Sequence, residues 1–191
     1  MDATERLLVD VGYAGLSSRR ITDEARQAHG SIRYHFGTLE RLILAVVDRQ
    51  TERLTTRQRE MYASPEPFSV KWQQAMSWFE EDLASGYPKL VAELRGASWN
   101  NPAYRPGIQR VIDEWSAVLG HAVAGASLQL DLDLDDETVR GITGLIRTSQ
   151  QAMLDDRLAG IDTDHRSIVT VVARLLEDLE RRAPVPDATT V

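Results

Sequence analysis

Residues 25–42 read ARQAHGSIRYHFGTLERL, and this stretch decides how the chain is interpreted. It holds two of the four histidines and three arginines, although the chain of 191 residues has a formal net charge of −7. Apolar residues recur between the polar ones at helical spacing, so we expect helices with one buried and one exposed face. The question is what the exposed, basic face contacts.

The charge of the chain is unevenly distributed. Residues 1–60 carry ten arginines, no lysine and nine acidic residues, a formal charge of +1, so the remaining residues carry −8. Charges more than about 8 Å apart are largely screened at physiological salt, so nearby groups set the field at a surface. A basic face in the N-terminal part can therefore bind DNA although the whole chain is acidic.

The N-terminal residues predict three short helices followed by a long one. Gly12 ends the first helix, and Ser17 or Ser18 caps the second, because a hydroxyl oxygen accepts an unpaired N–H group of a first helical turn. Gly37 breaks the chain again, and Thr38 caps the fourth helix. The predicted helices cover residues 3–11, 18–26, 28–36 and 39–61.

The rest of the chain also has a helical pattern. After the proline-containing turn at residues 64–67, apolar residues recur at spacings of three and four. Residues 128–134, LQLDLDL, come nearest to the alternation of a strand, but aspartate disfavours strands. We therefore expect an all-α fold of about nine helices. The later helices are predicted over residues 68–85, 88–99, 103–130, 136–158 and 164–182, and residues 183–191 are expected to be disordered.

Composition and spacing exclude several classes of protein. The chain has no cysteine, so disulfides, thiolate zinc sites and cysteine nucleophiles are ruled out. His121 and His165 are isolated, and neither a metal-ligand spacing nor a nucleophile elbow is found, so we expect no enzyme, no cofactor and no metal. No apolar run approaches ~20 residues and the N-terminus does not read as a secretory signal. We expect a cytoplasmic protein without a membrane partner.

Three short helices ahead of a long one are typical of a helix-turn-helix unit, here over about residues 17–36. The second helix of such a unit enters the major groove, where Arg reads guanine, Gln reads adenine, and hydroxyls and backbone N–H groups contact phosphates. A basic surface helix without a DNA role is the alternative, and His35 is as compatible with packing as with DNA contact. The residues expected to contact DNA are Ser17, Ser18, Arg19, Gln27, His29, Gly30, Ser31, Arg33, Tyr34, His35 and Thr38.

A series of short motifs runs through the same region: Gly12-Tyr13, Arg19, Ile21, Ala25, Gly30-Ser31-Ile32, His35-Phe36-Gly37 and Leu42. In this order they resemble the N-terminal DNA-binding domain of the TetR family of bacterial one-component transcriptional regulators. The resemblance covers about residues 5–45. It implies a DNA-binding domain over residues 1–45 and a helical ligand-binding and dimerisation domain over residues 46–182. The apolar residues expected in the core of the small domain are Ile21, Ala25, Ile32, Phe36 and Leu42.

Four residues depart from the family pattern. The turn glycine of the family falls on Arg26 and its serine N-cap on Ala28, and each change is expected to cost about 1 kcal/mol. The usual phosphate-binding tyrosine falls on Arg33, and the lysine that starts the fourth helix falls on Leu39. These departures predict DNA binding that is weakened, or that is directed to an unusual sequence.

The resemblance implies a small-molecule pocket in the middle of the chain, where three of the four tryptophans lie between residues 72 and 99. Small-molecule sites are mostly apolar with a few polar groups, so a largely apolar effector is expected. Each candidate side chain can equally belong to an ordinary core. The candidates are Trp78, Phe79, Leu83, Leu94, Trp99, Tyr104, Ile108, Ile112, Trp115, Gln150 and Met153.

The resemblance also implies that the last two helices pair with those of a second subunit. The final helix carries a wide aliphatic stripe without aromatic residues, which suits helix–helix packing. The alternative is that both stripes face the core of their own chain. The expected interface residues are Ile142, Leu145, Ile146, Ser149, Ile168, Val171, Val172, Leu175, Leu176 and Leu179.

Together these features predict a ligand-responsive transcriptional regulator. The resemblance implies a homodimer that binds a palindromic operator in double-stranded DNA, most often as a repressor, and that a small molecule releases. The alternative is a helical ligand-binding or protein-interaction module with weakened DNA binding.

Overall fold

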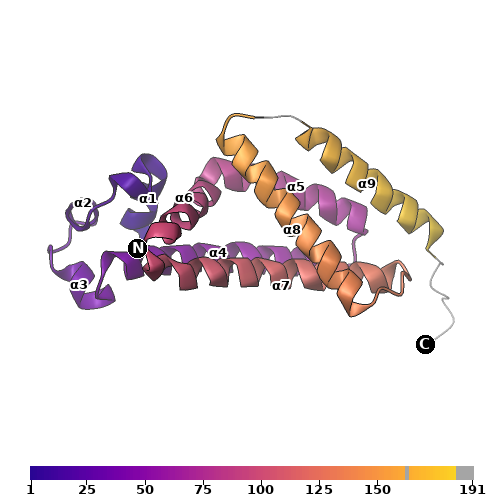
Figure 1. Ribbon diagram of the computed structural model, residues 1–191, viewed down its shortest axis with the longest axis horizontal. Helices are drawn as coiled ribbons and strands as arrows, with labels where there is room; N and C mark the ends of the chain where they lie inside the picture. Colours follow the sequence, from indigo (N-terminus) through magenta and orange to yellow (C-terminus); the bar gives the residue numbers. More distant parts are fainter. Residues whose placement is uncertain (162–163, 184–191) are drawn as a thin grey trace. The chain divides into compact units, whose positions relative to one another are not determined.

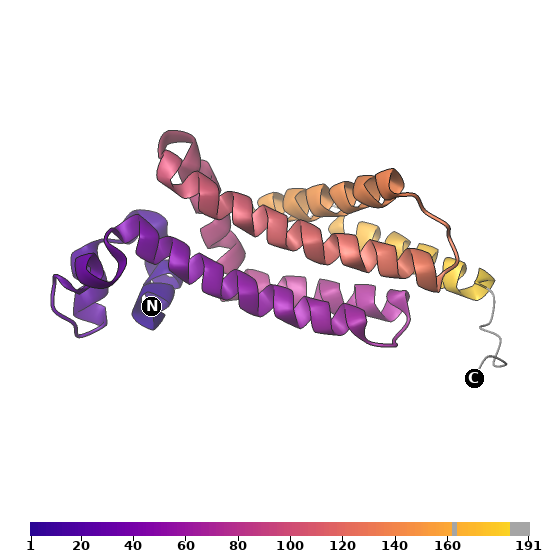
Figure 2. The same ribbon diagram turned by 90° about the horizontal axis from the view of Figure 1, so that it is seen from below.

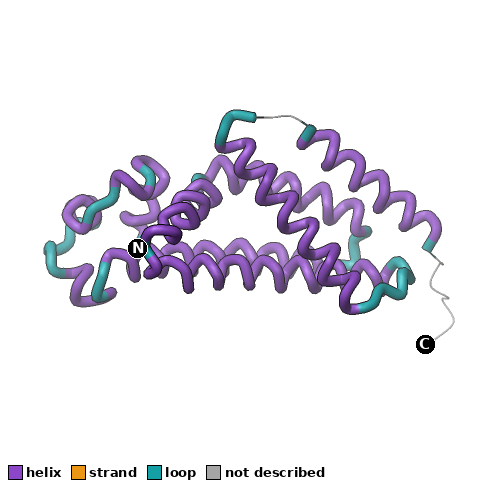
Figure 3. The backbone as a smooth tube through the Cα atoms, viewed as in Figure 1, coloured by secondary structure: helices purple, strands orange, loops and turns teal. Residues whose placement is uncertain are grey.

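The computed structural model describes residues 1–161 and 164–183. Over these residues the chain forms nine α-helices and two short 3₁₀ helices, η1 and η2, and no strand (Figure 3). The predicted all-α fold is therefore confirmed. Most of the tail that was expected to be disordered, residues 184–191, lies outside the described residues.

The helices follow one another through short connections (Figure 1). The fourth, α4, is a single uninterrupted helix of 25 residues, drawn in purple in Figure 2. Among the helices described here, none is long and apolar enough to cross a membrane. Their bounds are α1 Asp2–Val11, η1 Tyr13–Gly15, α2 Ser18–Glu24, α3 Ser31–Phe36, α4 Leu39–Ala63, α5 Phe68–Ser85, α6 Tyr87–Asn100, η2 Pro102–Tyr104, α7 Arg105–Gln129, α8 Asp136–Leu158 and α9 His165–Arg182.

The chain packs as two compact units. The first consists of Met1–Arg57 and Glu80–Glu114, and the second of Gln58–Phe79 and Trp115–Val191. Helices α4, α5 and α7 each contribute residues to both units. The division predicted between residues 45 and 46 concerns function rather than packing, and it stays a prediction.

The core of the first unit joins the three short helices to α4. Of the five residues predicted as the core of the small domain, Ile21, Ile32 and Leu42 are buried, whereas Ala25 and Phe36 are only half-buried. Next to them α4 buries an aliphatic stripe that includes Ile43 and Val46, both 0% exposed. Because each of the helices α1–α3 is too short to be stable alone, burial against this stripe is what holds them.

In the second unit, α9 is held against α5 by polar contacts at two points. The carboxylate of Glu180 accepts hydrogen bonds from the backbone N–H and the hydroxyl of Ser69, at 2.8 and 2.6 Å, and so caps the first turn of α5. The indole N–H of Trp72 donates to the backbone carbonyl of Val169 at 3.0 Å. These contacts fix one side of α9. Figure 1 shows α8 and α9 running in opposite directions.

Two predicted helix boundaries are wrong. Helix α2 ends at Glu24 rather than at residue 26, and α3 begins at Ser31 rather than at residue 28. The physical reason is Arg26, whose φ of 52° lies in the left-handed region and ends α2. Every other predicted helix agrees with the observed one to within two residues at each end.

Candidate functional site

The helix-turn-helix unit begins with a side-chain cap. The hydroxyl of Ser17 accepts a hydrogen bond from the backbone N–H of Arg20 at 3.2 Å, which confirms one of the two capping serines that the sequence offered. Ser17, Ser18 and Arg19 are all exposed at this end of α2. The first turn of α2 thus presents hydroxyl, guanidinium and backbone N–H groups to solvent, as phosphate contacts require.

The turn between α2 and α3 is closed by two backbone hydrogen bonds around Arg26. The N–H of Arg26 donates to the carbonyl of Asp23 at 3.1 Å, and the N–H of Gln27 donates to that of Thr22 at 2.9 Å. This pair of bonds is the Schellman arrangement, in which the residue just after the helix, here Arg26, takes up the left-handed region and is usually glycine. The φ of Arg26 is 52°, which lies in this region.

The start of α3 differs from the expectation. Ala28 is not the N-cap, because residues 28–31 form a turn that the N–H of Ser31 closes on the carbonyl of Ala28 at 2.9 Å. Gly30 is the N-cap, and it offers no side chain to the first turn. Gln27 and His29 therefore lie in the loop before α3 rather than in the helix.

The two faces of α3 are chemically different. Ile32 is buried in the first unit, whereas Arg33, Tyr34 and His35 are exposed. The phenol ring of Tyr34 is 86% exposed and meets the His35 ring edge to face at 4.8 Å. A tyrosine this exposed buries little of its apolar ring within its own chain, and its position suits contact with a partner.

The end of the motif and the start of α4 are joined by a cap. The hydroxyl of Thr38 accepts a hydrogen bond from the backbone N–H of Arg41 at 3.2 Å, which confirms the predicted cap. Leu39 is half-buried, and its side chain has neither a charge nor a hydrogen-bond donor with which to replace the phosphate contact of a lysine. Of the eleven residues expected to contact DNA, ten are exposed, and Ser31 is half-buried. Their role in DNA binding stays a prediction.

Helix α6 contacts η1, the segment between α1 and α2, within the first unit. The carboxylate of Glu93 accepts a hydrogen bond from the backbone N–H of Tyr13 at 2.6 Å. The rings of Tyr13 and Tyr104 pack edge to face, with centroids 5.5 Å apart, and burial raises the pKa of Tyr104. The contact of Glu93 with Tyr13 could not be predicted, since nothing in the sequence links residues 80 positions apart.

Helix α1 is tied to α4 by a set of charged groups. Arg49 donates to Asp2 at 2.6 Å and to Glu5 at 2.5 Å, and the hydrogen bond from Arg49 lowers the pKa of Asp2. The amide of Gln50 also donates to Glu5. Exposed ion pairs contribute little each, so we regard these bonds as orienting α1 rather than as a main source of stability.

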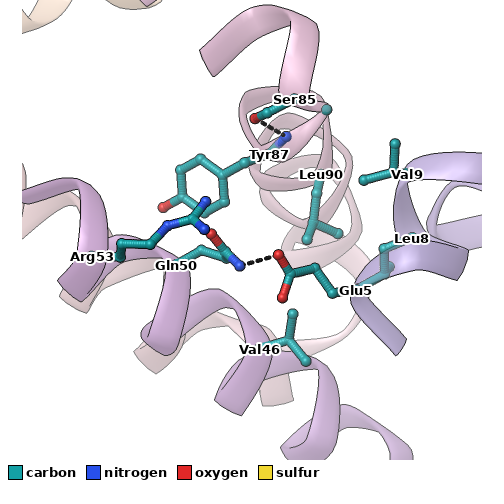
Figure 4. A pocket seen from close by; sticks show the side chains of 10 residues that line it. Glu5, Leu8, Val9, Val46, Gln50, Arg53, Ser85, Tyr87 and Leu90 are labelled. Carbon is teal, nitrogen blue, oxygen red and sulfur yellow. Dashed lines mark hydrogen bonds between the residues drawn. The ribbon is translucent and has the colours of Figure 1, made fainter. Parts of the chain in front are cut away.

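A small cavity lies beside Glu5 and Gln50, between residues of α1, α4 and the start of α6 (Figure 4). Its volume is about 40 Å³, enough for a few water molecules and far below the hundreds of Å³ of an organic effector site. None of the residues predicted to line an effector pocket lines it. The lining residues are Glu5, Leu8, Val9, Val46, Gln50, Arg53, Ser85, Gly86, Tyr87 and Leu90.

The residues predicted to line the effector pocket are divided between the two units. Leu94, Tyr104 and Ile108 are buried in the first unit and Met153 in the second. Trp99 is 75% exposed in the last turn of α6, and its place in an effector pocket stays a prediction. The assignment of the others, which are half-buried, stays a prediction: Trp78, Phe79, Leu83, Ile112, Trp115 and Gln150.

The residues predicted to form a subunit interface include several exposed aliphatic side chains. Leu145 on α8 is 70% exposed, and Ile168, Val171 and Leu175 on α9 are 40%, 52% and 56% exposed. Their spacing of three and four places the α9 residues on one face. Ser149 is exposed as well, and the remaining members are half-buried: Ile142, Ile146, Val172, Leu176 and Leu179.

Sequence comparison finds relatives of one kind. Residues 1–46 match a family model described as bacterial regulatory proteins, tetR family. Over 130 residues the chain is 28% identical to the HTH-type transcriptional regulator CymR of Pseudomonas putida. The match covers 68% of this chain and 64% of CymR, so the chain spans less than two thirds of the length of that relative.

Solved structures with a similar fold cover nearly the whole chain. GusR of Salmonella enterica has a TM-score of 0.72 at 18% identity, over 94% of this chain and 92% of its own. A TetR transcription regulator from Haloarcula marismortui has a TM-score of 0.71 at 16% identity, over 95% and 94%. The multidrug binding protein EbrR, complexed with imidazole, has a TM-score of 0.62 at 27% identity, over 98% and 89%.

Proposed function

Because the chain belongs to the TetR family of bacterial regulatory proteins, we propose that it is a transcriptional regulator that binds double-stranded DNA through α2 and α3. One observation carries the proposal: α3 buries Ile32 and exposes Arg33, Tyr34 and His35 at the end of a capped helix-turn-helix. Arginine and tyrosine at such a place serve base edges and phosphates. The protein then acts in the cytoplasm, where bacterial DNA lies.

We further propose that the protein acts as a homodimer. The exposed aliphatic residues Leu145, Val171 and Leu175 on α8 and α9 support this, since water contact with such side chains is unfavourable and a second copy can cover them. A two-fold dimer brings two copies of α3 to successive major grooves about 34 Å apart. Its operator is then a palindrome or a near-palindrome.

A small-molecule effector is the third part of the proposal. The similarity to EbrR, a multidrug binding protein seen with imidazole, supports a ligand site in the C-terminal part, and the buried and half-buried aromatic residues there favour a largely apolar ligand. The ligand acts by population shift: it binds better to the state that does not fit DNA, and so releases a repressor.

DNA binding is tested by selection from a random-sequence pool of duplexes with the full-length protein, followed by titration of the enriched duplex. We expect enrichment of a palindrome and binding that weakens steeply with salt, because phosphate contacts release counterions. Arg33→Ala and Tyr34→Ala should each weaken binding about tenfold, while Lys89→Ala, which removes an exposed charge from α6, should not. A pool without any enrichment would contradict DNA recognition and favour an interaction module.

The subunit interface is tested by sedimentation of the full-length protein. We expect a dimer, and we expect Val171→Glu with Leu175→Glu to give a folded monomer, since two charges on each copy would meet across the interface. A Glu substitution at Val70, which is also exposed but lies on α5, is the matched control and should leave the dimer intact. A wild-type monomer at micromolar concentration would contradict the proposal.

A further inference from the structure

His29 lies in the loop before α3 and is held there by a side chain of α2. Its Nδ1 atom lies 3.0 Å from the hydroxyl oxygen of Thr22, and Thr22 is 1% exposed. The His29 side chain itself is 69% exposed. One ring nitrogen is thus fixed by the protein, and the ring is open to solvent.

The hydroxyl of Thr22 has three neighbours but a single hydrogen. Its oxygen lies 3.0 Å from the carbonyl oxygen of Ser18 and 2.9 Å from that of Arg19, as is usual for threonine inside a helix. If the hydroxyl donates to a carbonyl, its lone pairs remain free to accept from Nδ1–H of His29. Two hydrogen bonds then form.

The opposite arrangement is less favourable. If the hydroxyl of Thr22 donated to an unprotonated Nδ1, one hydrogen bond would form and the hydroxyl oxygen would face two carbonyl oxygens without a hydrogen between them. Asp23 adds to the preference, since its carboxylate lies 3.9 Å from Nδ1. The same carboxylate is 3.8 Å from the guanidinium of Arg19. The neutral ring therefore carries its hydrogen on Nδ1.

The other ring nitrogen, Nε2, is then a hydrogen-bond acceptor. Within residues 1–161 and 164–183 it has no hydrogen-bond partner. In the major groove the groups that donate to such an acceptor are the amino groups of adenine and cytosine, whereas guanine presents two acceptors that would repel it. Arg33, with donors alone, has the opposite preference.

We propose that His29, oriented by Thr22, is a specificity-determining residue that accepts a hydrogen bond at Nε2 from an adenine or cytosine amino group. This inference rests on the proposed DNA binding. It assigns a role to Thr22, a buried residue that does not touch DNA, as the positioning residue that sets which ring nitrogen of His29 is an acceptor.

The tautomer is tested without DNA by ¹⁵N NMR of the full-length protein with labelled histidine, at about pH 8, where the ¹⁵N shifts also report whether each ring is neutral. The His29 signals are identified by their loss in His29→Gln. We expect the Nδ1–H tautomer in the wild type and in Thr22→Ser, which keeps the hydroxyl. In Thr22→Val, which has the same shape without the oxygen, the preference should disappear.

The base preference is tested by selection from a random duplex pool with the wild type, His29→Ala and His29→Arg. In the wild type we expect adenine or cytosine at one position of each half-site, preferred about threefold to tenfold, as for one hydrogen bond. His29→Ala should lose the preference at that position, and His29→Arg should change it to guanine, with the other positions unchanged.

Two results would overturn the inference: an Nε2–H tautomer in the wild type, or a selected site that is the same with all three proteins. Failure of the proposed function is a different result, since it would appear as no enrichment with any of the proteins. In that case the NMR measurement still decides whether Thr22 sets the tautomer of His29.

Discussion

The carboxylate of Glu93 on α6 accepts a hydrogen bond from the backbone N–H of Tyr13, at a distance of 2.6 Å. Tyr13 is the first residue of η1, directly after α1, and its N–H has no place in the hydrogen-bond ladder of either helix. Glu93 thus caps the junction between α1 and η1 from outside, and links α6 to the segment that precedes α2.

Removing the Glu93 carboxylate should destabilise the protein. We expect Glu93→Ala to lower the free energy of unfolding by about 1.5–3 kcal/mol, because a part-buried N–H loses a charged acceptor. Glu93→Gln, which keeps an acceptor oxygen, should cost less than half as much. Urea denaturation followed by circular dichroism measures both free energies. The control is Glu52→Ala, which removes an exposed glutamate of α4 and should change the free energy of unfolding by no more than about 0.5 kcal/mol. Equal costs for Glu93→Ala and Glu52→Ala would contradict the cap.

Gly12, at the same junction, should not tolerate a side chain. Its φ of 68° and ψ of 178° belong to a region that glycine alone readily adopts, and a Cβ there would lie 3.1 Å from Oε1 of Glu93. We expect Gly12→Ala to cost about 1–3 kcal/mol of unfolding free energy. Gly141→Ala is the matched control, because Gly141 lies inside α8 with open space around it. Alanine there should raise the free energy of unfolding slightly, since it favours a helix more than glycine does. If Gly12→Ala left the free energy of unfolding unchanged, the backbone at residue 12 would have relaxed to accept the side chain.

The helical fold and most helix ends could be predicted because apolar spacing and caps are local signals. Ser17 and Thr38 illustrate this, since each caps a helix through an N–H three residues further on. The start of α3 could not be predicted in the same way. Its place depends on a turn around Arg26 that carries no glycine, and the residues there suit a helix equally well.

Contacts between distant residues explain what the sequence could not predict of the site. Glu93 meets Tyr13, and Thr22 meets His29, through geometry that no local pattern encodes. The apolar stripe of α9 could be predicted from spacing, but spacing does not tell a buried face from an exposed one. The exposed fractions of Val171 and Leu175 in the structure show that this face of α9 is exposed in the single chain.

Relieving the left-handed conformation at Arg26 should stabilise the protein. Arginine at φ 52° costs about 1–2 kcal/mol, and glycine removes this strain. Glycine also has more conformational freedom in the unfolded chain, which offsets part of the gain in stability. We therefore expect Arg26→Gly to raise the free energy of unfolding by about 0.5–1 kcal/mol. Arg174→Gly, in the exposed interior of α9, should lower it by about 1 kcal/mol instead. If both substitutions destabilise, the strain assigned to Arg26 is absent.

The N-cap of α8 should make stability depend on pH. Asp135 accepts a hydrogen bond from the backbone N–H of Thr138 at 2.7 Å, and the side chain and backbone N–H of Thr138 lower the pKa of Asp135. A carboxylate with a lowered pKa stabilises the folded state above its unfolded pKa of about 4, and this contribution is lost as the pH falls through the lower, folded value.

Asp135→Asn isolates this effect, because asparagine keeps a capping oxygen but carries no charge. The urea midpoint of the wild type minus that of Asp135→Asn should be larger at about pH 7 than at about pH 3. All other carboxylates are common to the two proteins, so their titration cancels in the difference. Asp133→Asn, a change two residues earlier in the loop before α8, serves as the control for the general loss of an exposed charge. A difference that does not change with pH would show that the cap acts through its oxygen alone, and that the charge of Asp135 adds nothing to the start of α8.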